Sequence, residues 1–154
     1  MAKISVDQIE ATTKSALVRH GALDWVADEV ARATARSEAF GNRICGLYYL
    51  ESYCQQLTSG RVSGIVEPQV TRPRPGFVKV DAKYGFAQAA FARALAMAVT
   101  AARENGIAAL AIGHAHTCTS LGYFTEMIAG EGLIGIGFTN ASPIVAAPGG
   151  CKRV

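Results

Sequence analysis

The sequence predicts an α/β protein in which N-terminal helices precede a strand–helix–strand–helix–strand unit. Two unbroken apolar runs, 107–112 and 133–139, are typical of strands that are buried in a sheet. An alanine-rich stretch, 86–105, is typical of a long helix between strands. In the first 60 residues, apolar side chains instead recur at the spacing of amphipathic helices. These patterns together favour helices packed on a sheet.

Three helices are expected within the first 60 residues. Ser5 and Gln8 have the spacing of a capping box, so the first helix begins there and ends near Gly21. A second helix is expected over 24–39, where apolar residues recur with a helical period. A third is expected over 47–57, before a helix-breaking glycine.

A proline-containing stretch separates these helices from the α/β part. Residues 62–75 carry three prolines and alternating polar residues, which is typical of an extended excursion rather than a core element. We therefore divide the chain into an N-terminal helical region (1–60), an extended Pro-containing connection (61–76) and the first half of an α/β domain (77–154).

The α/β half is predicted to alternate strands and helices. The expected elements are a strand at 77–81, a helix at 86–105, a strand at 107–112, a helix at 121–131 and a strand at 133–139. A half-finished sheet exposes an unpaired strand edge, which promotes aggregation unless it is covered. We therefore expect the sheet to be completed by a missing segment or by a second chain.

Composition argues against several classes of function. Half of the 154 residues are hydrophobic, and the net charge of +3 is not gathered into a basic stripe with aromatics, so we expect no nucleic-acid partner. No apolar run approaches the roughly 20 residues of a membrane helix, and the N-terminus has no hydrophobic signal core. We expect a cytoplasmic protein without a membrane partner. The cysteines, Cys45, Cys54, Cys118 and Cys151, form no CxxC pair, so we expect free thiols and no metal site.

Two groups of residues could carry chemistry. The loop 113–120 follows a buried strand and opens a helix, where ligands gather in α/β sheets and where backbone N–H groups can bind phosphate. A polar connection whose histidines only hydrogen-bond the loop fits these residues equally well. Cys45 lies beside Arg43, whose charge could activate the thiol as a nucleophile, although a small buried hydrophobe is the commoner role. No GxGxxG motif is present, so an ordinary Rossmann site is not indicated.

Several motifs recur in the order found in one known family. They are F-x-x-V-D-A-x-x-G-F-A-Q at 77–88, E-N-G-I at 104–107, A-I-x-x-x-H at 111–116, L-G-Y at 121–123, E-G-L-I-G at 131–135, T-N at 139–140 and P-x-G at 148–150. The chain thus resembles the NAD(P)H-dependent malate/L-lactate dehydrogenase family of the second type. That family includes ureidoglycolate dehydrogenase, 2,3-diketogulonate reductase and Δ1-piperideine-2-carboxylate reductase.

The resemblance implies a non-Rossmann α/β fold, a dimer, and NAD(P)H bound near the subunit interface. It covers essentially the whole chain, which corresponds to about half of a family member. In the family, the loop after the second strand contacts the cofactor. The residues that match this loop are Thr117, Cys118, Thr119, Ser120 and Leu121, preceded by His116.

The chain departs from the family at the catalytic positions. Family members carry Ser-His-Gly-x-x-Arg on the third helix, where the histidine donates a proton and the arginine holds the substrate carboxylate. Here Ile44, Cys45 and Tyr49 stand at the Ser, His and Arg positions. A thiol replaces imidazole poorly as an acid near neutral pH, and tyrosine cannot clamp a carboxylate through two bonds. The candidate catalytic residues are Cys45 and Tyr49, which stand at the family's catalytic positions, and His116, which precedes the cofactor loop.

Two hypotheses follow for the function. In the first, the chain is part of an oxidoreductase of 2-keto acids or cyclic imino acids, completed by a second polypeptide, with NAD(P)H as cofactor and with such units paired as a dimer. In the second, it belongs to a non-redox, self-processed hydrolase of amide or lactam bonds, cut after Val154, which needs no cofactor. A truncated protein with a binding or scaffolding role is the third alternative.

Overall fold

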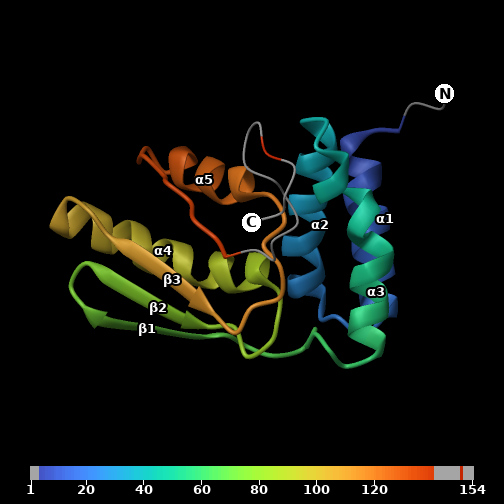
Figure 1. Cartoon of the computed structure of the whole chain (residues 1–154), viewed down its shortest axis with the longest axis horizontal. Helices are drawn as coiled ribbons and strands as arrows, with labels where there is room; N and C mark the ends of the chain where they lie inside the picture. The colour runs from blue at the N-terminus through green and yellow to red at the C-terminus, as the bar shows by residue number, and fades with distance from the viewer. Residues whose placement is uncertain (1–3, 141–149, 151–154) are drawn as a thin grey trace.

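The structure is a computed structural model that describes residues 4–140 and Gly150 (Figure 1). In chain order its elements are α1 (Val6–Arg19), α2 (Asp24–Ala39), the 3-10 turns η1 (Arg43–Cys45) and η2 (Leu47–Tyr49), α3 (Leu50–Thr58), β1 (Gln69–Arg74), β2 (Phe77–Asp81), α4 (Ala87–Asn105), β3 (Ala109–Gly113) and α5 (Leu121–Gly130). Helices α1, α2 and α3 stand together at one end of the molecule, and the sheet with α4 and α5 forms the other end (Figure 1).

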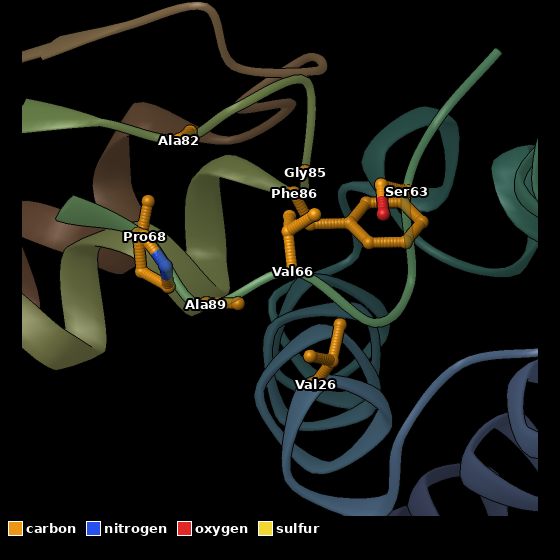
Figure 2. A pocket seen from close by; sticks show the side chains of 9 residues that line it. Val26, Ser63, Val66, Pro68, Ala82, Gly85, Phe86 and Ala89 are labelled. Carbon is orange, nitrogen blue, oxygen red and sulfur yellow. The ribbon is translucent and has the colours of Figure 1, made fainter.

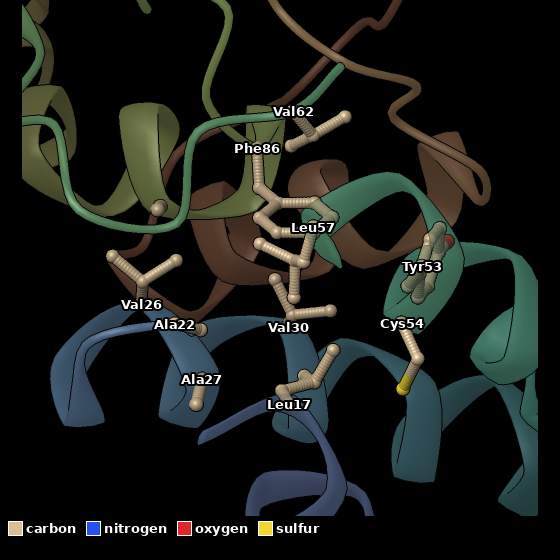
Figure 3. Packing of buried hydrophobic residues seen from close by; sticks show 11 residues of the cluster. Leu17, Ala22, Val26, Ala27, Val30, Tyr53, Cys54, Leu57, Val62 and Phe86 are labelled. Atoms are coloured by element: carbon tan, nitrogen blue, oxygen red, sulfur yellow. The ribbon is translucent and has the colours of Figure 1, made fainter. Parts of the chain in front are cut away.

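The N-terminal helices form a small bundle around an apolar core. The predicted capping box is confirmed, because the Gln8 N–H donates to Ser5 Oγ at 3.1 Å and the Ser5 N–H donates to Gln8 Oε1 at 3.0 Å. Figure 3 shows the core, to which Phe86 also contributes from the residue before α4. The buried members are Leu17, Ala22, Val26, Ala27, Val30, Tyr53, Cys54, Leu57, Val62, Phe86 and Ala89. The helical part and the α/β part therefore share one core.

The third helix begins later than the sequence predicts. A helix was expected from Leu47, but two 3-10 turns precede α3, which begins at Leu50. Gly46 lies between the two turns, against the side chain of Glu38 from α2. A Cβ on Gly46 would lie 2.7 Å from Glu38 Cδ, and the Leu47 N–H donates to Glu38 Oε1 at 2.8 Å. A contact with α2 thus holds this segment out of a regular helix.

The sheet has the order β1-β2-β3 in the described residues, with β1 antiparallel and β3 parallel to β2. Helix α4 connects β2 to β3, packs its alanines on the buried Val78 and Val80, and ends at Gly106 with φ +78°. The predicted α/β class, N-terminal helices followed by a sheet with helices, is confirmed. None of the helices in the described part is long and apolar enough to cross a membrane.

Strand β1 lies inside the stretch that the sequence predicts as an extended connection, 61–76. It pairs with β2 at one edge of the sheet, and the register shifts between Thr71 and Arg74. Pro73 lies within that shift. Because proline has no N–H to donate to a ladder, it is tolerated on an edge strand. Because of these prolines, the sequence pattern does not predict the strand that the structure shows.

The predicted buried strand at 133–139 does not form. This segment belongs to no strand of the described sheet, and the exposed fractions of Ile134, Ile136 and Phe138 are 94%, 75% and 89%. The intervening glycines face α5, where a Cβ on Gly135 would lie 3.0 Å from Ile128 Cβ. One face of the segment thus rests on α5, and nothing in the described residues covers the other. The prediction was wrong for these residues because a buried strand needs a neighbour on both faces.

Candidate functional site

The loop from His114 to Ser120 begins where the parallel strands β2 and β3 end. Backbone hydrogen bonds extend the pairing past the strands: the Tyr84 N–H donates to the His114 carbonyl at 2.7 Å, and the His116 N–H donates to the Gly85 carbonyl at 2.8 Å. Phe86 and His116 form a further isolated parallel bridge. This pairing holds the first half of the loop against the turn between β2 and α4.

His116 lies in an aromatic setting. Its ring packs edge-on against Tyr53 and Phe86, with centroid distances of 5.9 and 5.6 Å. Its Nδ1 atom is buried and has no hydrogen-bond partner among the described residues. Burial lowers the pKa of His116, and the positive charge of Arg61 lowers it further. The imidazole is therefore neutral near neutral pH.

A buried polar cluster packs against the buried side of the loop. Tyr53 is 1% exposed, and burial raises the pKa of its hydroxyl, with a smaller opposing effect from the nearby Thr119 hydroxyl. The Gln88 Nε2 atom lies 3.5 Å from the Cys118 carbonyl and 3.4 Å from Thr119 Oγ1, to which it donates. Gln88 Oε1 has no partner among the described residues. The Thr119 backbone is held at φ +53°, a conformation unusual for a non-glycine residue.

The candidate catalytic residues gather around Tyr53. Tyr49 stacks on the Tyr53 ring at a centroid distance of 6.0 Å, and His116 packs on the same ring. The thiols of Cys45 and Cys118 lie in the neighbourhood of the Tyr53 hydroxyl. All five side chains are thus brought to one place from α3, the turns before it and the loop after β3. Sequence reasoning did not include Tyr53 among the candidate site residues and missed its central position.

The second half of the loop leads into α5. Thr117 is exposed, and its Oγ1 accepts from the Thr119 N–H at 3.3 Å. Ser120 precedes the helix without a side-chain cap bond, and Leu121 is the first helical residue. An uncapped helix N-terminus behind a hydroxyl-rich loop offers N–H donors to a phosphate. These residues are the predicted cofactor-binding residues.

A second polar group lies at the first end of the loop, on the turn after β2. His114 Nδ1 lies 3.1 Å from Asp81 Oδ1, which also accepts the Lys83 N–H at 2.8 Å. The Tyr84 ring lies 5.4 Å from the His114 ring, tilted by 32°. The Lys83 N–H and then His114 hold the pKa of Asp81 below its usual value. Lys83, Tyr84 and His114 all have positive φ angles, of 48°, 61° and 48°.

Within residues 4–140, no large closed cavity borders these groups. The void in Figure 2 lies between Val26, Val66, Phe86 and their neighbours, with a volume of about 10 Å³. That volume is at the lower limit for one water molecule, so it is a packing gap and not a ligand site. The candidate site is therefore an open surface along the loop.

The described part of the chain shows neither a disulfide nor a metal cluster. Cys45, Cys54 and Cys118 are free thiols, and Cys151 lies outside the described residues. Among residues 4–140, no three His, Cys, Asp or Glu side chains are grouped to hold a metal ion.

Comparison with known proteins gives the family. The chain matches the malate/L-lactate dehydrogenase family over residues 4–154. It is 33% identical over 150 residues to the Δ1-pyrroline-2-carboxylate/Δ1-piperideine-2-carboxylate reductase of Pseudomonas putida, with 97% of this chain and 44% of the relative covered. It is 37% identical over 150 residues to the (2R)-3-sulfolactate dehydrogenase (NADP(+)) of Chromohalobacter salexigens, with the same coverage of 97% and 44%.

The solved structures agree on the fold. Malate dehydrogenase from Pyrococcus horikoshii OT3 superposes with a TM-score of 0.79 at 23% identity, covering 85% of this chain and 38% of that one. The chain thus spans less than half the length of the relatives it matches. Since the family match extends over nearly all of its residues, the chain belongs to the malate/L-lactate dehydrogenase family.

Proposed function

We propose that the chain is one part of an NAD(P)H-dependent oxidoreductase that reduces 2-keto acids or cyclic imino acids. The observation that carries this proposal is the hydroxyl-rich loop at the carboxyl ends of β2 and β3, in a chain of this family. The two relatives described above are named for a cyclic-imine reduction and for an NADP-dependent 2-hydroxy-acid oxidation. We expect the reaction to take place in the cytoplasm.

The loop provides the cofactor-binding residues of this proposal. Thr117, Thr119 and Ser120 offer hydroxyls, and the first turn of α5 after Ser120 offers N–H groups to the cofactor phosphates. A bound NAD(P)H would supply the hydride. Gln88 and Tyr53 keep the loop in place from the buried side.

The proposal includes a further polypeptide region. The match covers only 44% of each of the two relatives, so more than half of their length lies outside it. Ile134, Ile136 and Phe138, at alternate positions of the 133–139 segment, are strongly exposed, and we call these three side chains the apolar stripe. Such a stripe on a soluble protein marks an interaction site. The occupant that fits is the polypeptide region that follows the matched part in the relatives, on the same chain or on a second one.

Neither Cys45 nor Tyr49 performs the role that the family assigns to its position. A thiol is a poorer proton donor than imidazole, and tyrosine offers no bidentate clamp. Within residues 4–140, the Cys45 thiol forms no hydrogen bond to a histidine or a carboxylate, so its use as a hydrolytic nucleophile gains no support from these contacts. The proton donor and the carboxylate clamp must come from other residues.

The first test uses the chain together with every polypeptide that copurifies with it. The chain is purified under native conditions from its source cells, and every polypeptide in the sample is identified by intact mass and N-terminal sequence. Binding of NADPH and NADH is followed by nicotinamide fluorescence, and their oxidation is followed with pyruvate and with Δ1-piperideine-2-carboxylate. The isosteric Thr119→Val change should weaken cofactor binding, whereas Thr12→Val on the exposed face of α1 should not.

The outcomes separate the two hypotheses. Substrate-dependent oxidation of NADPH or NADH supports the oxidoreductase. A native sample that neither binds nor oxidises them overturns it. If that sample also contains a second chain beginning with Ser, Thr or Cys, the self-processed hydrolase is favoured instead.

A further inference from the structure

We propose that His114, with its ring fixed by Asp81, donates the proton in this reduction, an inference that rests on the oxidoreductase function proposed above. Its place in the fold supports the role. His114 begins the loop that carries the cofactor-binding residues, three positions before Thr117, at the carboxyl ends of β2 and β3. Ligands of α/β sheets bind at this edge.

The contact with Asp81 fixes which nitrogen of the ring carries the proton. An ionised carboxylate can only accept hydrogen bonds, so the 3.1 Å contact requires an N–H on Nδ1 of His114. The other nitrogen, Nε2, then exchanges its proton on a side chain that is 62% exposed. A histidine oriented by a carboxylate in this way is the usual form of a general acid or base.

The backbone is strained where the pair is built. Lys83, Tyr84 and His114 adopt positive φ angles although none is glycine, and they adjoin one another through the bond from the Tyr84 N–H to the His114 carbonyl. Strain of this kind persists only where the surroundings enforce it, and it gathers at functional sites. The result of this strain is a single arrangement in which Asp81, His114 and Tyr84 meet.

His116 is less suited to the same task. Its Nδ1 is buried without a partner in the described residues, and burial favours its neutral form. The titratable groups beside His114 are Asp81, Lys83 and Tyr84, from the turn after β2, whereas Arg61 acts on His116. The positive charge of Arg61 disfavours the protonated ring of His116.

A bound NAD(P)H would supply a hydride to the carbon of the substrate C=O or C=N bond and would leave as NAD(P)⁺. The carbonyl oxygen, or the nitrogen of a cyclic imine, takes the proton from His114 Nε2. The neutral imidazole that remains recovers a proton from water at Nε2, while its Nδ1–H continues to donate a hydrogen bond to Asp81.

The experiment has a structural readout and a kinetic readout. In the full chain, ¹⁵N chemical shifts of the imidazoles should show that the neutral His114 ring carries its proton on Nδ1. Asp81→Ala, which removes the Oδ1 acceptor that faces His114 Nδ1, should abolish that preference. A wild-type ring protonated mainly on Nε2 would overturn the proposal before any assay of activity.

In the native complex, His114→Gln should lower kcat by about 100-fold or more, with far less change in KM, and should remove the alkaline limb of the kcat–pH profile. His20→Gln is the matched control, because His20 is an exposed histidine at the C-terminal end of α1, where its ring contacts the Ala16 carbonyl. An active wild type with an unchanged His114→Gln profile would overturn this proposal and leave the oxidoreductase standing. An inactive wild type would overturn both.

Discussion

The apolar stripe on the 133–139 segment gives the most direct test of the incomplete assembly. The double change Ile134→Thr with Ile136→Thr keeps β-branched side chains and so keeps the extended preference. Because these side chains are 94% and 75% exposed, the change should alter the free energy of unfolding of the isolated chain by no more than about 0.5 kcal/mol. Urea unfolding followed by Trp25 fluorescence measures this quantity.

The matched control is Val80→Thr, the same kind of change at a fully buried position of β2. A hydroxyl buried there without a hydrogen-bond partner should lower the free energy of unfolding by about 1–3 kcal/mol. In the native complex the stripe should instead be covered, so the double change should weaken association by about 1–2 kcal/mol for each isoleucine. If the double change destabilises the isolated chain as much as Val80→Thr does, the stripe is buried and the docking surface does not exist.

Three further predictions address packing, the loop and pH. Gly64→Ala should cost about 1–3 kcal/mol, because its Cβ would lie 2.7 Å from backbone between α1 and α2, while Gly130→Ala, with nothing within 4 Å, should stabilise by up to about 1 kcal/mol; thermal unfolding checks both. Gln88→Met should remove the donor to Thr119 and weaken NADPH binding by the native complex, as nicotinamide fluorescence would show, with Gln55→Met on the exposed face of α3 as control. Burial lowers the pKa of folded His116, so its contribution to stability is full above the unfolded value of about 6.5 and is lost as pH falls below it. His116→Gln should therefore flatten the fall in unfolding free energy between about pH 7 and 5 in urea titrations; an unchanged slope would contradict this.

Local signals in the sequence predicted the elements whose causes lie within a few residues. The capping box at Ser5 and Gln8 occurs as expected, because it depends on a single helical turn. The helix predicted at 86–105 is observed as α4 with nearly the same limits. Here the chain's own composition decides the structure.

The predictions from the sequence were wrong where the cause of the local structure lies elsewhere in the chain or outside the described residues. The start of α3 depends on Glu38, which approaches Gly46 from α2 and cannot be seen in the local pattern. The 133–139 segment has the composition of a buried strand but lacks the second neighbour that burial requires. The cluster around Tyr53 likewise depends on three separate segments, although the polar Gln88 inside an alanine-rich helix was a usable signal.

The two histidines of the loop show how the backbone, and not the residue type, assigns chemistry. His114 and His116 are two residues apart, so a regular extended chain would direct both side chains to the same face. The positive φ of His114 breaks that alternation. As a result, one imidazole meets the carboxylate of Asp81 in the open, and the other meets the rings of Tyr53 and Phe86 in a half-buried setting. We therefore propose His114, whose ring lies against Asp81 and away from the Tyr53 and Phe86 rings, as the proton donor of the proposed reduction.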